Sequence, residues 1–167
     1  SDDCLSVRFE HDDVGALDDV VVERRDRWEY VQVKYAVDNG QTWSVEDLTV
    51  PARARGTSLL RKWAAAWDGI RARGGQYAIR VVTNRVPDAG LALLLDTNRR
   101  GFAAERFQSD RDAAATAVMN ATGLPEDQAR QFLRELSFAF GQPMLEALRR
   151  DTQAGFERIG TTQDGWA

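Results

Sequence analysis

The sequence is poor in three things: it has one cysteine, no apolar run of membrane-spanning length and no excess of positive charge. The single Cys4 excludes an internal disulfide and a zinc site built from cysteines, a usage that fits the cytosol. The first residues, SDDCLSVRFE, have neither the charged nor the apolar region of a signal peptide, so we expect a cytoplasmic protein without a membrane-spanning segment. The chain begins without Met, almost directly in a strand-like run, and we expect it to be a piece cut from a longer protein.

The charge balance limits the kinds of partner. Lys and Arg number 22 against 26 Asp and Glu, which gives a formal net charge of −4. Since the whole chain is not a polycation, any contact with nucleic acid must come from a local basic patch. The length of 167 residues fits one domain, and 43% hydrophobic with 29% charged residues is typical of a soluble globular protein. Neither an internal repeat nor a low-complexity linker divides it.

The most informative stretch is 17–36, LDDVVVERRDRWEYVQVKYA, which predicts a β-hairpin. Its first strand is the β-branched run 20–22, and its second, 29–35, alternates polar and apolar residues with a period of two. Residues two apart in a strand share a face. Gln32 and Lys34 are therefore expected on one face of the hairpin, with the apolar Val31 and Val33 on the other.

The length of the hairpin loop decides which aspartate joins that face. If Arg25-Asp26 are the centre of a two- or four-residue loop, paired positions sum to 51 and Asp19 faces Gln32. A three-residue turn shifts the pairing by one residue and turns Asp19 to the other face, in favour of Asp18. The sequence leaves both alternatives open.

The remaining patterns predict an α/β fold, a small mixed sheet flanked by helices, in a single domain over 1–167. The core over 1–88 holds a strand at 5–9 closed by Glu10, a short helical turn capped by Ser44, a helix capped by Thr57 or Ser58 and ended by Gly74-Gly75, and a strand at 77–83. A strand, a helix and another strand in that order indicate a crossover unit. The extension over 89–167 is expected to be mainly helical, with an alanine-rich segment at 110–121, a helical stripe of Phe132, Leu133, Leu136 and Phe140, and a last helix from Pro143.

A carboxylate at the head of one strand, with a side-chain oxygen and a lysine on its partner, is the set that metal-dependent phosphodiester cleavage needs. The carboxylate and the oxygen suit Mg²⁺, a hard cation. The metal polarises the phosphate and lowers the pKa of a bound water, and the lysine offsets negative charge.

These residues resemble the PD-(D/E)xK nuclease superfamily, in the branch with Gln-x-Lys in place of Glu-x-Lys, as in Mrr-like restriction enzymes. The runs VRFE, LDDVVVE and YVQVKY, the SLLRKWAAAW helix, the VVTN strand end and the LPEDQARQFLRELSFAF segment look like the N-terminal double-stranded DNA endonuclease domain of bacterial antiphage effectors. Such domains precede a SAVED sensor in CBASS effectors and the NTPase of Avs-type STAND proteins.

The resemblance implies a restriction-endonuclease-like fold and a Mg²⁺ cofactor, for which Mn²⁺ can substitute. It implies Asp19 as metal ligand, with Asp18 as the alternative, Gln32 in the second ligand position, Lys34 as the catalytic lysine and Glu10 as an accessory acid. The implied substrate is double-stranded DNA, cut with little sequence specificity. The implied partners are a covalently attached sensor or NTPase domain and further copies of the chain in an activated homo-oligomer, with no membrane.

Simpler readings accompany each of these assignments. A solvated strand face explains Gln32 and Lys34 equally well, and the whole chain then reads as a catalytically inactive nucleic-acid- or protein-binding domain with the nuclease fold. An enzyme of the same fold acting on RNA or on single strands is a further alternative. A phosphate-contacting rim is expected at the basic residues near the hairpin, although each also reads as solvated surface: Arg53, Arg55, Arg61, Lys62 and Arg85, with Asn84 beside the last.

Overall fold

The computed structural model describes residues 4–9, 16–17, 19–37, 41–108 and 112–143. The strands are β1 (Cys4–Phe9), β2 (Val20–Arg24), β3 (Trp28–Val33), β4 (Thr42–Trp43), β5 (Tyr77–Val82), β6 (Val86–Pro87) and β7 (Leu136–Ala139). The helices are α1 (Val45–Thr49), α2 (Leu59–Arg73), α3 (Ala89–Ala92), the 3₁₀ turn η1 (Ala104–Phe107), α4 (Ala113–Thr122) and α5 (Glu126–Glu135).

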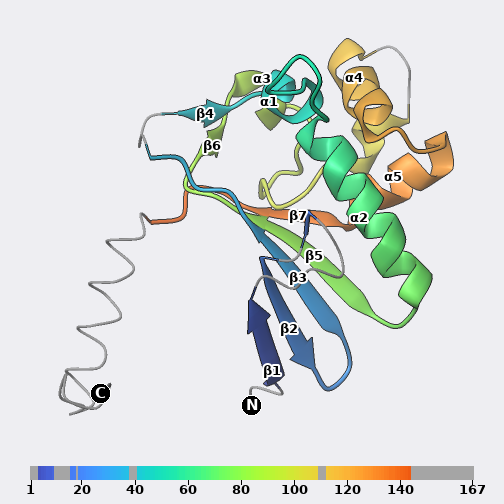
Figure 1. Ribbon diagram of the computed structural model, residues 1–167. Helices are drawn as coiled ribbons and strands as arrows, with labels where there is room; N and C mark the ends of the chain where they lie inside the picture. Colours follow the sequence, from blue (N-terminus) through green and yellow to red (C-terminus); the bar gives the residue numbers. More distant parts are fainter. Residues whose placement is uncertain (1–3, 10–15, 18, 38–40, 109–111, 144–167) are drawn as a thin grey trace.

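Five strands form one mixed sheet in the order β1-β2-β3-β5-β7. The first three are antiparallel neighbours, whereas β3, β5 and β7 run parallel to one another. The short strands β4 and β6 form a separate parallel pair. The predicted α/β class, a mixed sheet flanked by helices, is confirmed, and α3, α4 and α5 are the helices of the described part of the second half (Figure 1).

Helix α2 makes the crossover from β3 to β5 and runs across one side of the sheet (Figure 1). It begins where the Ser58 side chain accepts the N–H of Arg61 and ends at Gly74, whose φ of 72° suits a residue without a Cβ. Its apolar stripe of Trp63, Trp67 and Ile70 is at most 1% exposed and joins the core with the inward side chains of the sheet. Helix and cap are where the sequence predicted them.

One carboxylate ties three of these elements together. Glu135 of α5 accepts hydrogen bonds from Trp67 Nε1 of α2 and the Tyr77 hydroxyl of β5, both at 2.7 Å, and from Gln131 Nε2 at 2.9 Å. Burial acts to raise the pKa of Glu135, but the three donors together lower it below its usual value. Burial, reinforced by the Glu135 contact, raises the pKa of Tyr77 to about 12.

The end of α5 corrects one expectation. The stripe that continues through Leu136 and Phe140 predicts helix, but the helix stops at Glu135 and β7 follows. Leu136, Phe138 and Phe140 also alternate with a period of two, so the local pattern fits both structures. Pairing with β5, with a hydrogen bond of 2.6 Å from the Ser137 hydroxyl to the carbonyl of Ile79, decides for strand.

After β5, the short strand β6 ends at Pro87 and α3 follows directly, capped by Asp88 Oδ1, which accepts the N–H of Leu91. Two smaller expectations meet different outcomes. The capped helical turn after Ser44 is confirmed as α1. The helix expected from Pro143 lies almost entirely outside the described residues.

Candidate functional site

The hairpin of β2 and β3 has a two-residue loop. The N–H of Arg24 donates to the carbonyl of Arg27 at 2.9 Å, which leaves Arg25 and Asp26 as the loop. In the ladder Val20 pairs with Val31 and Glu23 with Trp28. The register in which paired positions sum to 51 is therefore confirmed, and the three-residue alternative is wrong.

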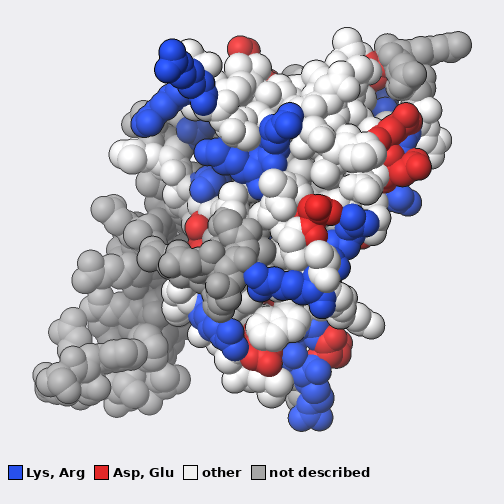
Figure 2. All heavy atoms as spheres, turned by 45° about the vertical axis from the view of Figure 1, so that its right-hand side comes forward, with Lys and Arg blue, Asp and Glu red and all other residues white. Residues whose placement is uncertain are grey.

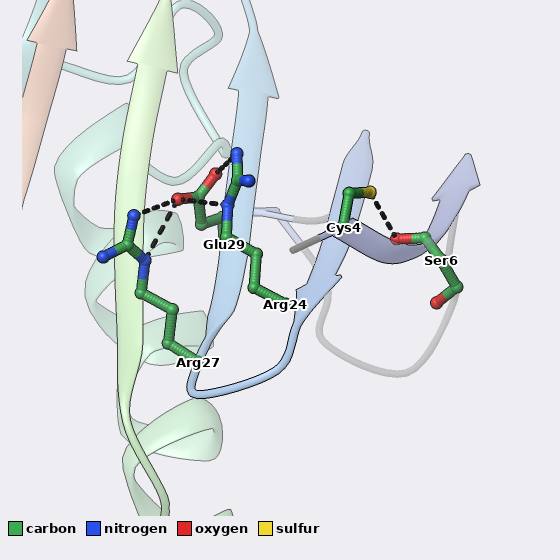
Figure 3. A network of polar contacts seen from close by, with 5 residues as sticks. All are labelled: Cys4, Ser6, Arg24, Arg27 and Glu29. Carbon is green, nitrogen blue, oxygen red and sulfur yellow. Dashed lines mark hydrogen bonds and ion pairs between the residues drawn. The ribbon is translucent and has the colours of Figure 1, made fainter. Parts of the chain in front are cut away.

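A carboxylate fixes the two arginines that flank this loop (Figure 3). Arg27 reaches Glu29 Oε1 through Nε at 3.1 Å and Nη2 at 2.8 Å, while Arg24 Nη2 reaches Oε2 at 3.1 Å. The hydrogen bond from Arg24, with a smaller contribution from Arg27 and against burial, lowers the pKa of Glu29. Because Glu29 is an odd-numbered residue of β3, this network lies on the face of the hairpin opposite Gln32.

Asp19 and Gln32 are in direct contact. Asp19 stands immediately before β2, and its Oδ2 accepts hydrogen bonds from Gln32 Nε2 and from the backbone N–H of Val33, the latter at 2.7 Å. The carboxylate thus continues the hydrogen bonding between the two strands beyond the last backbone pair of β2 and β3. The two side chains that the register predicted to face each other do so.

The face on which they lie differs from the expectation. Gln32 is 2% exposed and shares its face with Tyr30 and Val21, which are buried, whereas Val31 and Val33 are only half-buried. The expectation of a polar face opposite an apolar one is therefore wrong, because α2 covers the face that holds Gln32. The reading of Gln32 as part of a solvated strand face is contradicted as well.

Lys34 follows two residues after Gln32, directly past the end of β3. Its backbone N–H donates to the carbonyl of Val82 at 2.8 Å, so the β3–β5 pairing extends one residue past the end of β3. By alternation its side chain lies on the face of Gln32, and it is half-buried. Within the described residues its ammonium group makes no hydrogen bond or ion pair, which leaves it available to an anion.

The side chain of Asn84 connects the segment that follows β3 to the segment that follows β5, a role that the sequence did not reveal. Its Oδ1 accepts the N–H of Ala36 at 2.9 Å, and its Nδ2 donates to the carbonyl of Ala36 at 2.8 Å. The segment just past Lys34 is thereby tied to the segment just past β5. The only sequence signal for this bracing role was a polar residue directly after a buried strand, and the expectation that Asn84 contacts DNA stays a prediction.

The structure gives the surroundings of the basic residues that were expected to form a phosphate-contacting rim. Arg53, Arg55 and Lys62 are exposed, and Figure 2 shows Lys and Arg gathered on the upper left of one face, with more Asp and Glu among them on its right. The guanidinium group of Arg61 lies against Gly123 at the end of α4, so close that a Cβ on Gly123 would come within 2.6 Å of Nη1. Arg85 donates to Gln41 Oε1 at 2.7 Å. Asp18 and Glu10 lie outside the described residues.

The oxygen atoms available as metal ligands at this end of the hairpin suit a hard cation. They are the carboxylate of Asp19, whose Oδ1 has no partner in the described part of the chain, the amide oxygen of Gln32 and the carbonyl of Val33. All are oxygens, which suits Mg²⁺ or Mn²⁺. Gln32 turns its amide nitrogen toward Asp19, so ligation through Oε1 requires the amide to rotate. The described residues contain no group of three His, Cys, Asp or Glu side chains that could hold a metal.

Comparison with known proteins gives no identification: no family model matches the chain, and neither does any curated protein sequence. Among the described residues, no helix has the length and apolar character that crossing a membrane requires.

Proposed function

We propose that this chain is a metal-dependent DNA endonuclease, which hydrolyses phosphodiester bonds of double-stranded DNA with little sequence specificity as the effector module of an antiphage defence system. The observation that carries the proposal is the contact between Asp19 and the buried Gln32, two residues before a lysine whose ammonium is unengaged within the described residues. A glutamine at 2% exposure that is bonded to a carboxylate is not explained by a solvated strand face.

Each residue has a defined task in this proposal. Asp19 holds the cation through its carboxylate, and Gln32 either supplies an amide oxygen or orients that carboxylate. When bound, Mg²⁺ would polarise the scissile phosphate and activate a water. Lys34 neutralises negative charge on the phosphate oxygens as the bond breaks. The order β1-β2-β3, a crossover containing α2, and then β5 beside β3 is a mixed α/β arrangement that is not specific to nucleases.

The rival function is a catalytically inactive domain that binds nucleic acid or protein. A hydrogen bond from Gln32 to Asp19 is enough to close the end of the hairpin ladder without any metal, so the same contact also serves a scaffold. The two functions differ in their response to divalent ions, because only a metal site gains stability from them.

The test is nicking of supercoiled plasmid with Mg²⁺ by the wild type, by Lys34→Ala and by Arg106→Ala, the last removing an exposed charge on η1. We expect the wild type and Arg106→Ala to cut alike and Lys34→Ala to lose nearly all activity while unfolding at the same urea concentration. Equal cutting by Lys34→Ala would remove the lysine from the mechanism. If the wild type neither cuts nor gains stability from Mn²⁺, the inactive-domain function replaces the nuclease.

A further inference from the structure

The outer edge of β7 borders an open hollow of about 550 Å³, here called the β7 hollow. Three arginines from two separate segments line it: Arg80 from β5, and Arg99 and Arg100 from the loop that follows α3. Asn98 and Gln142 add polar side chains, and no Asp or Glu is among the described residues that line it. The hollow is therefore a concave surface of one charge sign.

Backbone pairing fixes these arginines beside one another. Arg80 pairs with Ser137 across β5 and β7, and Gly101 bridges to Ser137 from the other side. The N–H of Phe138 donates to the carbonyl of Arg100 at 2.7 Å, so the loop is attached to the edge strand. At a strand spacing of about 4.8 Å, the backbones of Arg80 and Gly101 lie roughly 10 Å apart.

The loop is built to present its basic residues. Asp96 Oδ1 accepts the N–H groups of Asn98 and Arg100 at 2.9 and 3.0 Å, which closes a tight turn. Within that turn Arg99 has a φ of 54°, the only positive φ of a non-glycine residue in the described part of the chain. An arginine there is strained where glycine would not be, which favours a role for its side chain.

None of the three guanidinium groups is neutralised. Within the described residues they make no hydrogen bond or ion pair, whereas Arg24, Arg27, Arg71 and Arg130 each pair with a carboxylate. Unpaired arginines around a hollow without carboxylates attract a polyanion, a molecule that carries several regularly spaced negative charges. Since the planar guanidinium matches phosphate oxygens in a bidentate way, phosphate is the group that these residues fit best.

We infer that the β7 hollow binds the sugar–phosphate backbone of nucleic acid, with Arg80, Arg99 and Arg100 as phosphate contacts. The choice of nucleic acid over an acidic protein rests on the proposed function. The hollow also reaches the carboxyl ends of the parallel strands through Ala139 and Phe140, the edge of the sheet at which β3 delivers Lys34. Arg80 is the register partner of Val31, so it lies on the face of the sheet opposite Gln32 and Lys34. A bound strand would therefore have to pass around this edge of the sheet to join the candidate site, and would not follow the rim around Arg53 and Arg55 alone.

The experiment is fluorescence anisotropy of a labelled DNA duplex in EDTA, which prevents cleavage, over a series of salt concentrations. The test variant is Arg80→Gln with Arg100→Gln. The control, Arg106→Gln with Arg134→Gln, removes the same charge from exposed positions elsewhere. Each phosphate contact contributes about 0.9 to the slope of log affinity against log salt concentration, which at 0.1 M salt corresponds to about eightfold in affinity. The test variant lacks two contacts, so it should bind roughly 60-fold more weakly and its slope should be smaller in magnitude by about 1.8.

The outcomes separate this inference from the proposed function. Affinity and slope equal to those of the control would overturn the inference, even if Lys34→Ala abolishes cleavage. A loss confined to the test variant supports it, even if the wild type never cuts DNA. Polyglutamate that competes as well as DNA at equal charge would instead assign the hollow to an acidic protein and overturn it.

Discussion

Replacing the buried Gln32 tests the site most directly. Gln32→Leu keeps the volume but removes the donor to Asp19, and a hydrogen bond to a charged group is worth about 1.5–3 kcal/mol. Gln32→Glu has a larger effect, because it places a second carboxylate against the first at the rim of the apolar core. Like charges at such a distance raise the pKa of one member of the pair.

We therefore expect Gln32→Leu to lose about 1.5–3 kcal/mol of unfolding free energy without metal. Gln32→Glu should lose more at pH 8 than at pH 5, since the pair takes up a proton as the pH falls. If Asp19 belongs to a metal site, Mg²⁺ should restore stability to Gln32→Glu, by about 2.7 kcal/mol at a hundred times the dissociation constant. Urea unfolding at both pH values, with Mg²⁺ or EDTA, measures all of these effects.

The chain offers a matched control in Gln131, whose amide donates to Glu135 at 2.9 Å in the same kind of pair, at the end of β3 opposite to the Asp19–Gln32 contact. Gln131→Glu should also be less stable at pH 8 than at pH 5, but Mg²⁺ should not restore it. Equal stability of Gln32→Glu and the wild type at pH 8 in EDTA would show that the amide does not hold Asp19. Equal rescue of both variants by Mg²⁺ would reduce the effect to general charge screening.

Three further predictions use other parts of the molecule. Arg53→Ala with Arg55→Ala should weaken duplex binding and lower its salt slope by about 1.8 if both contact phosphate, and an unchanged slope removes them from the DNA path. Glu135 has a lowered pKa, so its ionised form contributes stability that is present above the unfolded pKa near 4.5 and is lost as the pH falls through the folded pKa. In thermal unfolding, Glu135→Gln should therefore be less stable than the wild type at pH 7 by about 1–3 kcal/mol, and its stability should change less between pH 5 and 3. In Mn²⁺ calorimetry, Asp19→Asn should lose binding and Asp18→Asn should keep it, and the reverse result makes Asp18 the ligand.

The hairpin was predictable because its information is local. Alternation in 29–35 and the polar turn fix the strands, and parity then places Asp19 opposite Gln32. The ends of α2 were equally readable, since Ser58 and Gly74 act within one turn of the helix. In each case the residues that decide the structure lie within a few positions of the feature itself.

The unpredicted features depend on contacts between distant segments. The run LSFAF fits helix and strand alike, and only an open edge on β5 makes it a strand. The burial of Gln32 follows from the core that α2 and other distant segments build on its face of the sheet, which alternation within the hairpin does not contain. The β7 hollow is a stronger case, because Arg80 and Arg100 are brought together by hydrogen bonds to a strand that sequence patterns assign to a helix.

The identity of residue 32 bears on how the site behaves before any cation arrives. Asp19 already accepts the N–H of Val33, and the neutral amide of Gln32 satisfies the same oxygen without adding charge beside the core. A glutamate in this position would leave two carboxylates at the rim of the core, a stable arrangement only with a cation or a proton between them. Glutamine therefore suits a site that stays folded without metal, while its amide oxygen is a weaker ligand than a carboxylate. If the chain acts as the proposed nuclease, we accordingly expect tight metal binding only when a phosphate of the DNA completes the ligand set.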